Sequence, residues 1–231
     1  MFQYGKGSLN DESGFPSHSE RRVRALLIAP AASRAPYGAA SALVLDAATL
    51  HEGTVPTARG QVSLYLRVHA PDDDLAAASA LRPDGIVLAR CEGGRDVARL
   101  GARLAVLEAE AGLADGATGI LAMVGTARGV LGLSSLAGAS PRLAGIAWDA
   151  EALAAGIGAP AARDAGGLIP PLLQARGLVR LAAAAAGVEA IDTAYPAEGD
   201  GLLAELAAAR RDGFGAKLAR SPDHAARIAS R

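Results

Sequence analysis

The chain has 231 residues, of which 51% are hydrophobic and 20% are charged, and its formal net charge is −1. That length suits one domain with one core, so we expect a single domain over residues 21–231. The balanced charge and a pI near 6.4 exclude an extensive basic surface for nucleic acid or anionic membrane. A single cysteine excludes an internal disulfide framework, and no signal-peptide pattern or long apolar span is present. We therefore expect a cytoplasmic protein.

Residues 1–20 are predicted to form a flexible arm. Gly, Ser, Asn and Asp alternate there with isolated aromatic residues, and no hydrophobic period is present. Phe2, Tyr4 and Phe15 are a large share of the chain's few aromatic residues, which leaves open that the arm docks on a neighbouring molecule.

Eight short apolar runs recur along the rest of the chain, and several end on a charged residue. Continuous Val, Ile and Leu runs without strict alternation are typical of parallel strands buried on both faces. The intervening stretches are rich in Ala or polar residues, so the rhythm predicts a TIM-type (β/α)8 barrel with its chemistry where strands end. The predicted strands are Ala25–Pro30, Ala42–Asp46, Ser63–Val68, Gly85–Arg90, Gly119–Val124, Leu143–Trp148, Glu189–Ala194 and Ala216–Ala219.

Four stretches between these runs are predicted to be helices. One carries apolar residues at three- and four-residue steps, and another begins with proline and ends before glycine. The predicted helices are Asp74–Leu81, Gly94–Glu110, Pro171–Ala186 and Gly201–Asp212.

Two early connections are short for crossover helices. The segment between Pro30 and Ala42 contains Pro36 and Gly38, and the segment from Leu50 to Gln61 contains two glycines and a proline. A parallel βαβ connection usually takes a dozen or more residues. We therefore expect the barrel to be shortened in its first two βα units.

Five separated blocks of the sequence carry a family resemblance and occur in the family's order. They resemble the citrate lyase β-subunit-like group of the HpcH/HpaI aldolase family. The resemblance implies a barrel that holds Mg²⁺ at its strand ends and cleaves or forms a carbon–carbon bond. It implies a hydroxyacyl-CoA or small 2-keto acid as substrate, and a homo-oligomer, with a trimer expected. Family members generally continue past the last of these blocks with further helices, so we expect this barrel to be shortened at its C-terminus. The blocks are Pro83–Val97, Thr126–Leu131, Pro141–Ala159, Leu172–Tyr195 and Gly213–Ile228.

The acidic residues of the family's metal site are replaced in this chain. Cleavage of this type leaves an enolate, which a cation held by carboxylates stabilises, and Mg²⁺ takes hard oxygen ligands. The resemblance places the two metal ligands at Gly125 and Ala152, whose side chains offer no oxygen. Asp149 and Glu151 are weak substitutes, because a side chain one position out of register points to the other face. Mg²⁺ is therefore expected from the resemblance alone.

Three charged residues at strand ends are candidates for substrate binding. The resemblance matches Arg67 to an arginine that holds a substrate carboxylate or carbonyl, although a structural ion pair is an equal alternative. Asp46 also matches, and we favour a hydrogen-bonded loop anchor for it. Arg90 stands where the family commonly carries lysine.

The histidines and the cysteine form no recognisable metal-binding or catalytic motif in the sequence. His18, His51, His69 and His224 lack metal-ligand spacing and are expected in surface or loop positions. Cys91 has no histidine placed to pair with it, so an inert buried thiol is expected.

Two functions therefore remain open. The first is a carbon–carbon lyase of the citrate lyase β type, impaired by the loss of its metal ligands or completed at a subunit interface. The second is a non-catalytic barrel that acts as a binding or scaffolding subunit. Ancestry supports the first and the residues of the site support the second.

Overall fold

The computed structural model describes residues 23–29, 37, 39–50, 61–73, 75, 81–197 and 199–230. The predicted arm at residues 1–20, most of the predicted helix Asp74–Leu81 and most of the two short early connections lie outside these residues. Among the described helices, none has the length and apolar character needed to cross a bilayer.

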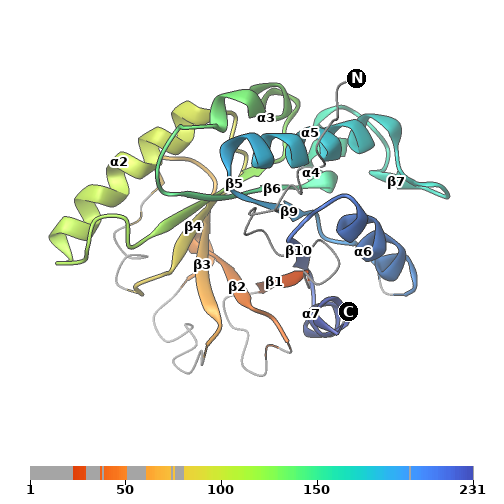
Figure 1. The fold of residues 1–231 in the computed structure, drawn as a ribbon, viewed down its shortest axis with the longest axis horizontal. Helices are drawn as coiled ribbons and strands as arrows, with labels where there is room; N and C mark the ends of the chain where they lie inside the picture. Colours follow the sequence, from red (N-terminus) through yellow and green to blue (C-terminus); the bar gives the residue numbers. More distant parts are fainter. Residues whose placement is uncertain are drawn as a thin grey trace, which may run out of the picture.

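Eight parallel strands close into one barrel, which confirms the predicted fold. Each strand pairs with its neighbours in the order β1-β10-β9-β6-β5-β4-β3-β2, and β1 lies beside β10, the last strand of the chain (Figure 1). The ring therefore also closes across the two early units, where β1 pairs with β2 and β2 with β3. The strands are β1 (Arg24–Ala29), β2 (Ala42–Asp46), β3 (Ser63–Val68), β4 (Gly85–Leu88), β5 (Gly119–Val124), β6 (Leu143–Trp148), β9 (Glu189–Asp192) and β10 (Ala216–Ala219).

The described helices lie on the outside of the ring, along the side formed by β5, β6, β9, β10 and β1 (Figure 1). Three predicted helices are confirmed within a residue at each end, whereas α3, α4, α7 and the hairpin β7–β8 were not predicted individually. The α-helices are α2 (Gly94–Glu110), α3 (Ala127–Gly132), α4 (Ala150–Gly156), α5 (Pro170–Ala186), α6 (Gly201–Arg211) and α7 (Pro222–Ala229). The short elements are the 3-10 turns η1 (Ala47–Thr49) and η2 (Leu133–Leu136), and the hairpin strands β7 (Arg163–Asp164) and β8 (Gly167–Leu168).

Two apolar layers hold the barrel together. One fills the barrel interior with side chains such as Leu26, Val44, Met123 and Leu218. The other, much larger layer lies between the strands and the helices. Burial on both faces explains why the strand sequences are continuous apolar runs instead of alternating ones.

Three of the helices begin directly after a strand on a capping side chain. Thr126, Asp149 and Ser221 follow β5, β6 and β10 closely, and each accepts hydrogen bonds from backbone N–H groups of the first helical turn. Such caps satisfy amide groups that a helix start leaves unpaired. The strand ends are thereby fixed in position around one end of the barrel.

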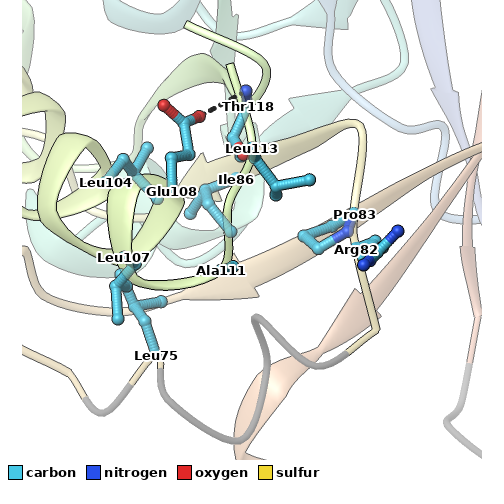
Figure 2. Close-up of a pocket in the computed structure, with 10 residues that line it drawn as sticks. All are labelled: Leu75, Arg82, Pro83, Ile86, Leu104, Leu107, Glu108, Ala111, Leu113 and Thr118. Carbon is cyan, nitrogen blue, oxygen red and sulfur yellow. Dashed lines mark hydrogen bonds between the residues drawn. The ribbon is translucent and has the colours of Figure 1, made fainter. Parts of the chain in front are cut away.

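A shallow apolar cavity lies at the opposite, amino-terminal end of the strands. Figure 2 shows Ile86 of β4 and Leu104 of α2 on its wall, with Pro83 and Thr118 just before β4 and β5. Residues 76–80, which follow Leu75 on the cavity wall, lie outside the described residues. The cavity is thus remote from the strand ends where barrels of this kind carry their chemistry.

A buried ion pair fastens α2 to the strands at this amino-terminal end. Glu108 accepts two hydrogen bonds from Arg142, at 2.8 and 2.7 Å, and others from the amides of Gly116 and Thr118. Both side chains are nearly inaccessible, at 3% and 6% exposed. Burial raises the pKa of Glu108, but these hydrogen bonds outweigh it and lower that pKa to about 2. The carboxylate is therefore charged in the folded protein at all ordinary pH values.

Glu108→Gln tests this ion pair. The variant is expected to lose about 3 kcal/mol of unfolding free energy at pH 7, because a lowered carboxyl pKa stabilises the folded state. This stability is complete above the unfolded pKa, near 4.5, and is lost as the pH falls toward 2. Denaturant melts of both proteins between pH 2 and 7 measure the difference.

The control is Glu110→Gln, an exposed carboxylate on the same helix. A pH-independent difference between Glu108→Gln and the unmodified protein, or an equal loss in the control, contradicts the account of the pair.

Candidate functional site

The carboxyl ends of the eight strands meet at one end of the barrel, here called the mouth. Side chains alternate along a strand, so residues two positions after an interior residue point toward the barrel axis. Asp46, Arg67, Gly125 and Asp149 each follow an interior residue in this way. The closed ring thus brings four of the sequence-predicted positions to one place.

Gly125 and Ala152 face each other at the mouth. A Cβ atom built on Gly125 would lie 3.3 Å from the Cβ of Ala152 and 3.6 Å from the Cβ of Asp149. Side chains at positions 125 and 152 therefore share one small volume, as two ligands of a single ion would. A hydrogen atom and a methyl group cannot coordinate a divalent cation, which needs oxygen ligands.

The two substitute acids are already engaged in other contacts. Asp149 Oδ1 accepts the amides of Glu151 and Ala152, each at 3.1 Å, and so caps α4. Glu151 Oε1 accepts a hydrogen bond from Arg163 at 2.6 Å. Within the described ranges, no three His, Cys, Asp or Glu side chains are grouped as a metal site requires. The residues present do not fit Mg²⁺.

Asp46, Arg67 and His69 form a charged group at the mouth, here called the Asp46 cluster. The register of β2 and β3 pairs Asp46 with Arg67. Asp46 Oδ2 accepts hydrogen bonds from Arg67 Nη2 at 2.7 Å and Nε at 3.2 Å, and from His69 Nε2 at 3.1 Å. Its Oδ1 accepts the amide of Ala48 at 3.1 Å. Asp46 thus anchors the turn after β2, and it also orients two other side chains.

The cluster keeps Asp46 ionised. Burial raises the pKa of this carboxyl, but hydrogen bonds from Arg67, His69 and the Ala48 amide outweigh burial and lower the pKa below its usual value. The Arg67 side chain is 26% exposed, so a ligand at the mouth can still reach its guanidinium. Arg67 is therefore paired with Asp46 and at the same time presents part of its side chain to a ligand.

Arg90 lies two residues beyond the end of β4 and not within the strand, as the predicted range Gly85–Arg90 had it. Its backbone is left-handed, with φ of 56°, a conformation that non-glycine residues seldom adopt. Its side chain is exposed, and no acidic residue within the described ranges pairs with it. It adds positive charge beside the mouth.

Cys91 is buried next to Arg90. Burial, together with the charges of Asp96 and Glu92, raises the pKa of its thiol to about 11 and outweighs a lowering effect from a backbone hydrogen bond with Gly93. A protonated, inaccessible thiol is a poor nucleophile, which agrees with the inert cysteine expected from the sequence.

A second charged group, here called the buried charge layer, lies outside the strands beneath the mouth. Lys217 of β10 is fully buried and donates to the Thr193 carbonyl at 2.7 Å and to Asp192 at 3.4 Å. Asp192 of β9 also accepts from Arg176 of α5 at 3.1 Å and from the Trp148 indole at 3.0 Å. Burial raises the pKa of Asp192, but the charges of Lys217 and Arg176 outweigh it and lower that pKa.

The layer continues outward to the rim of the mouth. Glu205 of α6 accepts from Lys217 at 3.0 Å and from Arg163 at 2.6 Å. Arg163, on β7, reaches Glu151 and lies over the Tyr195 ring. These contacts tie α4, the hairpin and α6 to the ends of β9 and β10. The sequence analysis did not predict this layer. The available signal was a charged residue inside each of two apolar strand runs, Asp192 and Lys217, which indicates a buried partner.

The histidines are distributed differently from the prediction. His224 is buried in α7, at 2% exposed, so its expected surface or loop position was wrong. The amphipathic helix that carries it buries this face against the barrel. His69 lies in a loop as expected, but it is paired with Asp46, a contact that separation by 23 residues concealed. His18 and His51 lie outside the described residues.

Comparison with known proteins gives consistent results. The family model for HpcH/HpaI aldolase/citrate lyase matches residues 38–222, and no curated protein matches the chain significantly. RipC from Yersinia pestis is 27% identical, with a TM-score of 0.64 over 90% of this chain and 94% of that one. CitE from Mycobacterium tuberculosis with magnesium, acetoacetate and coenzyme A is 22% identical, with a TM-score of 0.68 over 93% and 82%. The citrate lyase beta subunit from M. tuberculosis with oxaloacetate and magnesium is 24% identical, with a TM-score of 0.66 over 91% and 97%.

Asp192→Asn tests the buried charge layer. The variant removes the buried carboxylate that Lys217 and Arg176 share, and leaves them paired only with Glu205 and Asp212 at the edge of the layer. We therefore expect a loss of about 3–5 kcal/mol in unfolding free energy. For a chain of this size, this corresponds to roughly 6–20 °C in melting temperature by calorimetry. Asp164→Asn on the exposed hairpin is the control. A loss below about 1 kcal/mol for Asp192→Asn would show that the layer does not hold the strand ends.

Proposed function

The chain belongs to the HpcH/HpaI aldolase/citrate lyase family, and from this premise we propose that its Mg²⁺-dependent carbon–carbon lyase activity is impaired while its mouth still binds a small carboxylate. The observation that carries the proposal is the facing pair Gly125 and Ala152. Positions 125 and 152 lie close enough together to hold one Mg²⁺ ion, but their side chains offer it no oxygen ligand. In the lyase reaction a divalent ion would stabilise the enolate, so its loss would remove a large electrostatic contribution to that step.

Ligand binding is supported by the cationic groups that remain. Arg67 projects at the mouth with part of its side chain accessible, and Arg90 is exposed just beyond the end of β4 and has no acidic partner within the described ranges. Arginine suits planar carboxylates because two N–H groups can donate in parallel. The related CitE structures contain acetoacetate, oxaloacetate and coenzyme A, and we propose a keto acid or a CoA thioester as the ligand class here.

Two alternatives have specific support. A lyase with rearranged ligands is favoured by Asp149, whose Cβ lies 3.6 Å from a Cβ built on Gly125. A non-catalytic binding or scaffolding subunit is favoured by the buried charge layer, which keeps the barrel rim intact without metal ligands. In either case we propose a cytoplasmic homo-oligomer, with a trimer as the form to look for by light scattering.

Titration calorimetry with Mg²⁺ tests the impaired site. The unmodified protein is expected to show no binding in the millimolar range. Gly125→Glu combined with Ala152→Asp is expected to bind Mg²⁺, since it adds two facing carboxylates, and one or two suffice for this ion. Gly125 has no left-handed backbone, and its built Cβ lies 3.3 Å from the Ala152 Cβ, so a side chain at position 125 requires Ala152 to shift by a few tenths of an ångström.

The matched control is Ala155→Asp with Gly156→Glu, which adds the same charges on the exposed end of α4. Binding by the unmodified protein would refute the proposal. Equal binding by both double variants would show that added charge, and not the restored site, attracts the ion.

Activity provides a separate prediction. Purified protein is expected to leave citramalyl-, malyl- and citryl-CoA uncleaved in the presence of Mg²⁺, as measured by release of the acyl-CoA product. Clear turnover that EDTA abolishes would favour the lyase with rearranged ligands.

A further inference from the structure

The Asp46 cluster contains the arrangement of a proton-transfer site. A carboxylate holds one nitrogen of an imidazole, and a guanidinium lies on the same carboxylate oxygen. All three side chains lie at the mouth, where a ligand of this barrel would bind. None of them depends on a metal ion for its position.

Asp46 fixes the orientation of the His69 ring. A carboxylate can only accept hydrogen bonds, and the lowered pKa of Asp46 keeps it ionised, so Nε2 of His69 must carry a proton. In the neutral ring Nδ1 is then the acceptor. The His69 side chain is 50% exposed, and Nδ1 has no polar contact within the described ranges. The backbone is held as well, because Asp73 accepts the His69 amide at 2.7 Å.

Arg67 keeps donors available for a ligand. Its Nε and Nη2 donate to Asp46, whereas Nη1 has no hydrogen-bond partner among the described residues. The free edge of the guanidinium can therefore donate to an oxygen that gains negative charge. An exposed base and a cationic donor held on one carboxylate are the two groups that removal of a proton next to a carbonyl requires.

We propose that His69 is a base that removes a proton from the carbon adjacent to the carbonyl of a small keto acid, without a metal ion. The C–H bond breaks, its proton passes to Nδ1 of His69, and its electron pair forms the carbon–carbon double bond of the enolate. The carbonyl π electrons move to oxygen, where Arg67 Nη1 donates a hydrogen bond. Return of a proton from His69 to the same carbon regenerates the keto acid.

Asp46 is a positioning residue in this scheme. It sets the tautomer of His69 and keeps Arg67 beside the ring, but it does not touch the substrate. The inference rests on the proposed function, since it supplies a reaction that the mouth can carry out after loss of the metal ligands.

Solvent exchange measures this proton transfer directly. Pyruvate is incubated in D₂O with the unmodified protein and excess EDTA, and loss of the methyl signal is followed by proton NMR. We expect exchange above the buffer background, and a decrease of about 100-fold or to background in His69→Gln, which is the usual size of a general-base contribution. Asp72→Asn, an exposed carboxylate of the same loop, is the control and is expected to exchange like the unmodified protein.

The role of Asp46 has its own readout. Nitrogen-15 NMR of labelled histidine is expected to show His69 with its proton on Nε2 in the unmodified protein. In Asp46→Asn, both this preference and the exchange rate are expected to fall. An unchanged tautomer in Asp46→Asn would refute the positioning role.

The outcomes separate this inference from the proposed function. No exchange by the unmodified protein, or equal exchange in His69→Gln, overturns the inference and leaves the calorimetric test of the missing metal site unaffected. Exchange that requires Mg²⁺ and disappears with EDTA contradicts both. Recovery of exchange in His69→Ala on addition of imidazole would support His69 as the base.

Discussion

Closure of eight parallel strands into one ring is the constraint on which the whole molecule depends. Closure puts every strand end at the same mouth, so residues far apart in the chain become neighbours there. It pairs Asp46 with Arg67 and brings position 125 against position 152. The backbone presents positions 125 and 152 to each other, which is the geometric basis of the proposal that a metal site has been lost there.

Stability and chemistry are located in different layers of this barrel. The apolar interior, the layer under the helices and the buried charge layer hold the strands. The mouth residues contribute helix caps and the charged contacts of the Asp46 cluster. A barrel supported in this way does not need polar side chains at positions 125 and 152 for its fold, since a hydrogen atom and a methyl group stand there. What remains at the mouth is a carboxylate that orients an arginine and a histidine, which is the basis for expecting metal-free chemistry.

The fold was largely predictable from the sequence, because strands buried on both faces are continuous apolar runs. Five strands, among them Ser63–Val68 and Gly119–Val124, have the predicted bounds. Gly85–Arg90 was predicted too long because Ala89 continues the apolar run beyond Leu88, the last strand residue, before Arg90 turns left-handed. The helices α3, α4 and α7 are short, and their signal was the capping residue in front of each instead of a long apolar stripe.

The site was predictable only in part. The resemblance located Gly125 and Ala152, and the structure brings these positions together. The contact between Asp46 and His69 was not predicted because it depends on strand register and loop course, which no local pattern encodes. The pairing of Asp192 with Lys217 has the same origin, although charged residues inside apolar runs indicated that some partner exists.

A crystal structure of the protein soaked with Mn²⁺ and pyruvate would test the central claim most directly. Anomalous diffraction locates Mn²⁺ unambiguously, and this ion accepts the same oxygen ligands as Mg²⁺. The account predicts no anomalous peak at the mouth, with a pyruvate oxygen on Arg67 and its methyl group facing His69 Nδ1. A metal peak bound by Asp46, Asp149 or Glu151 would contradict it.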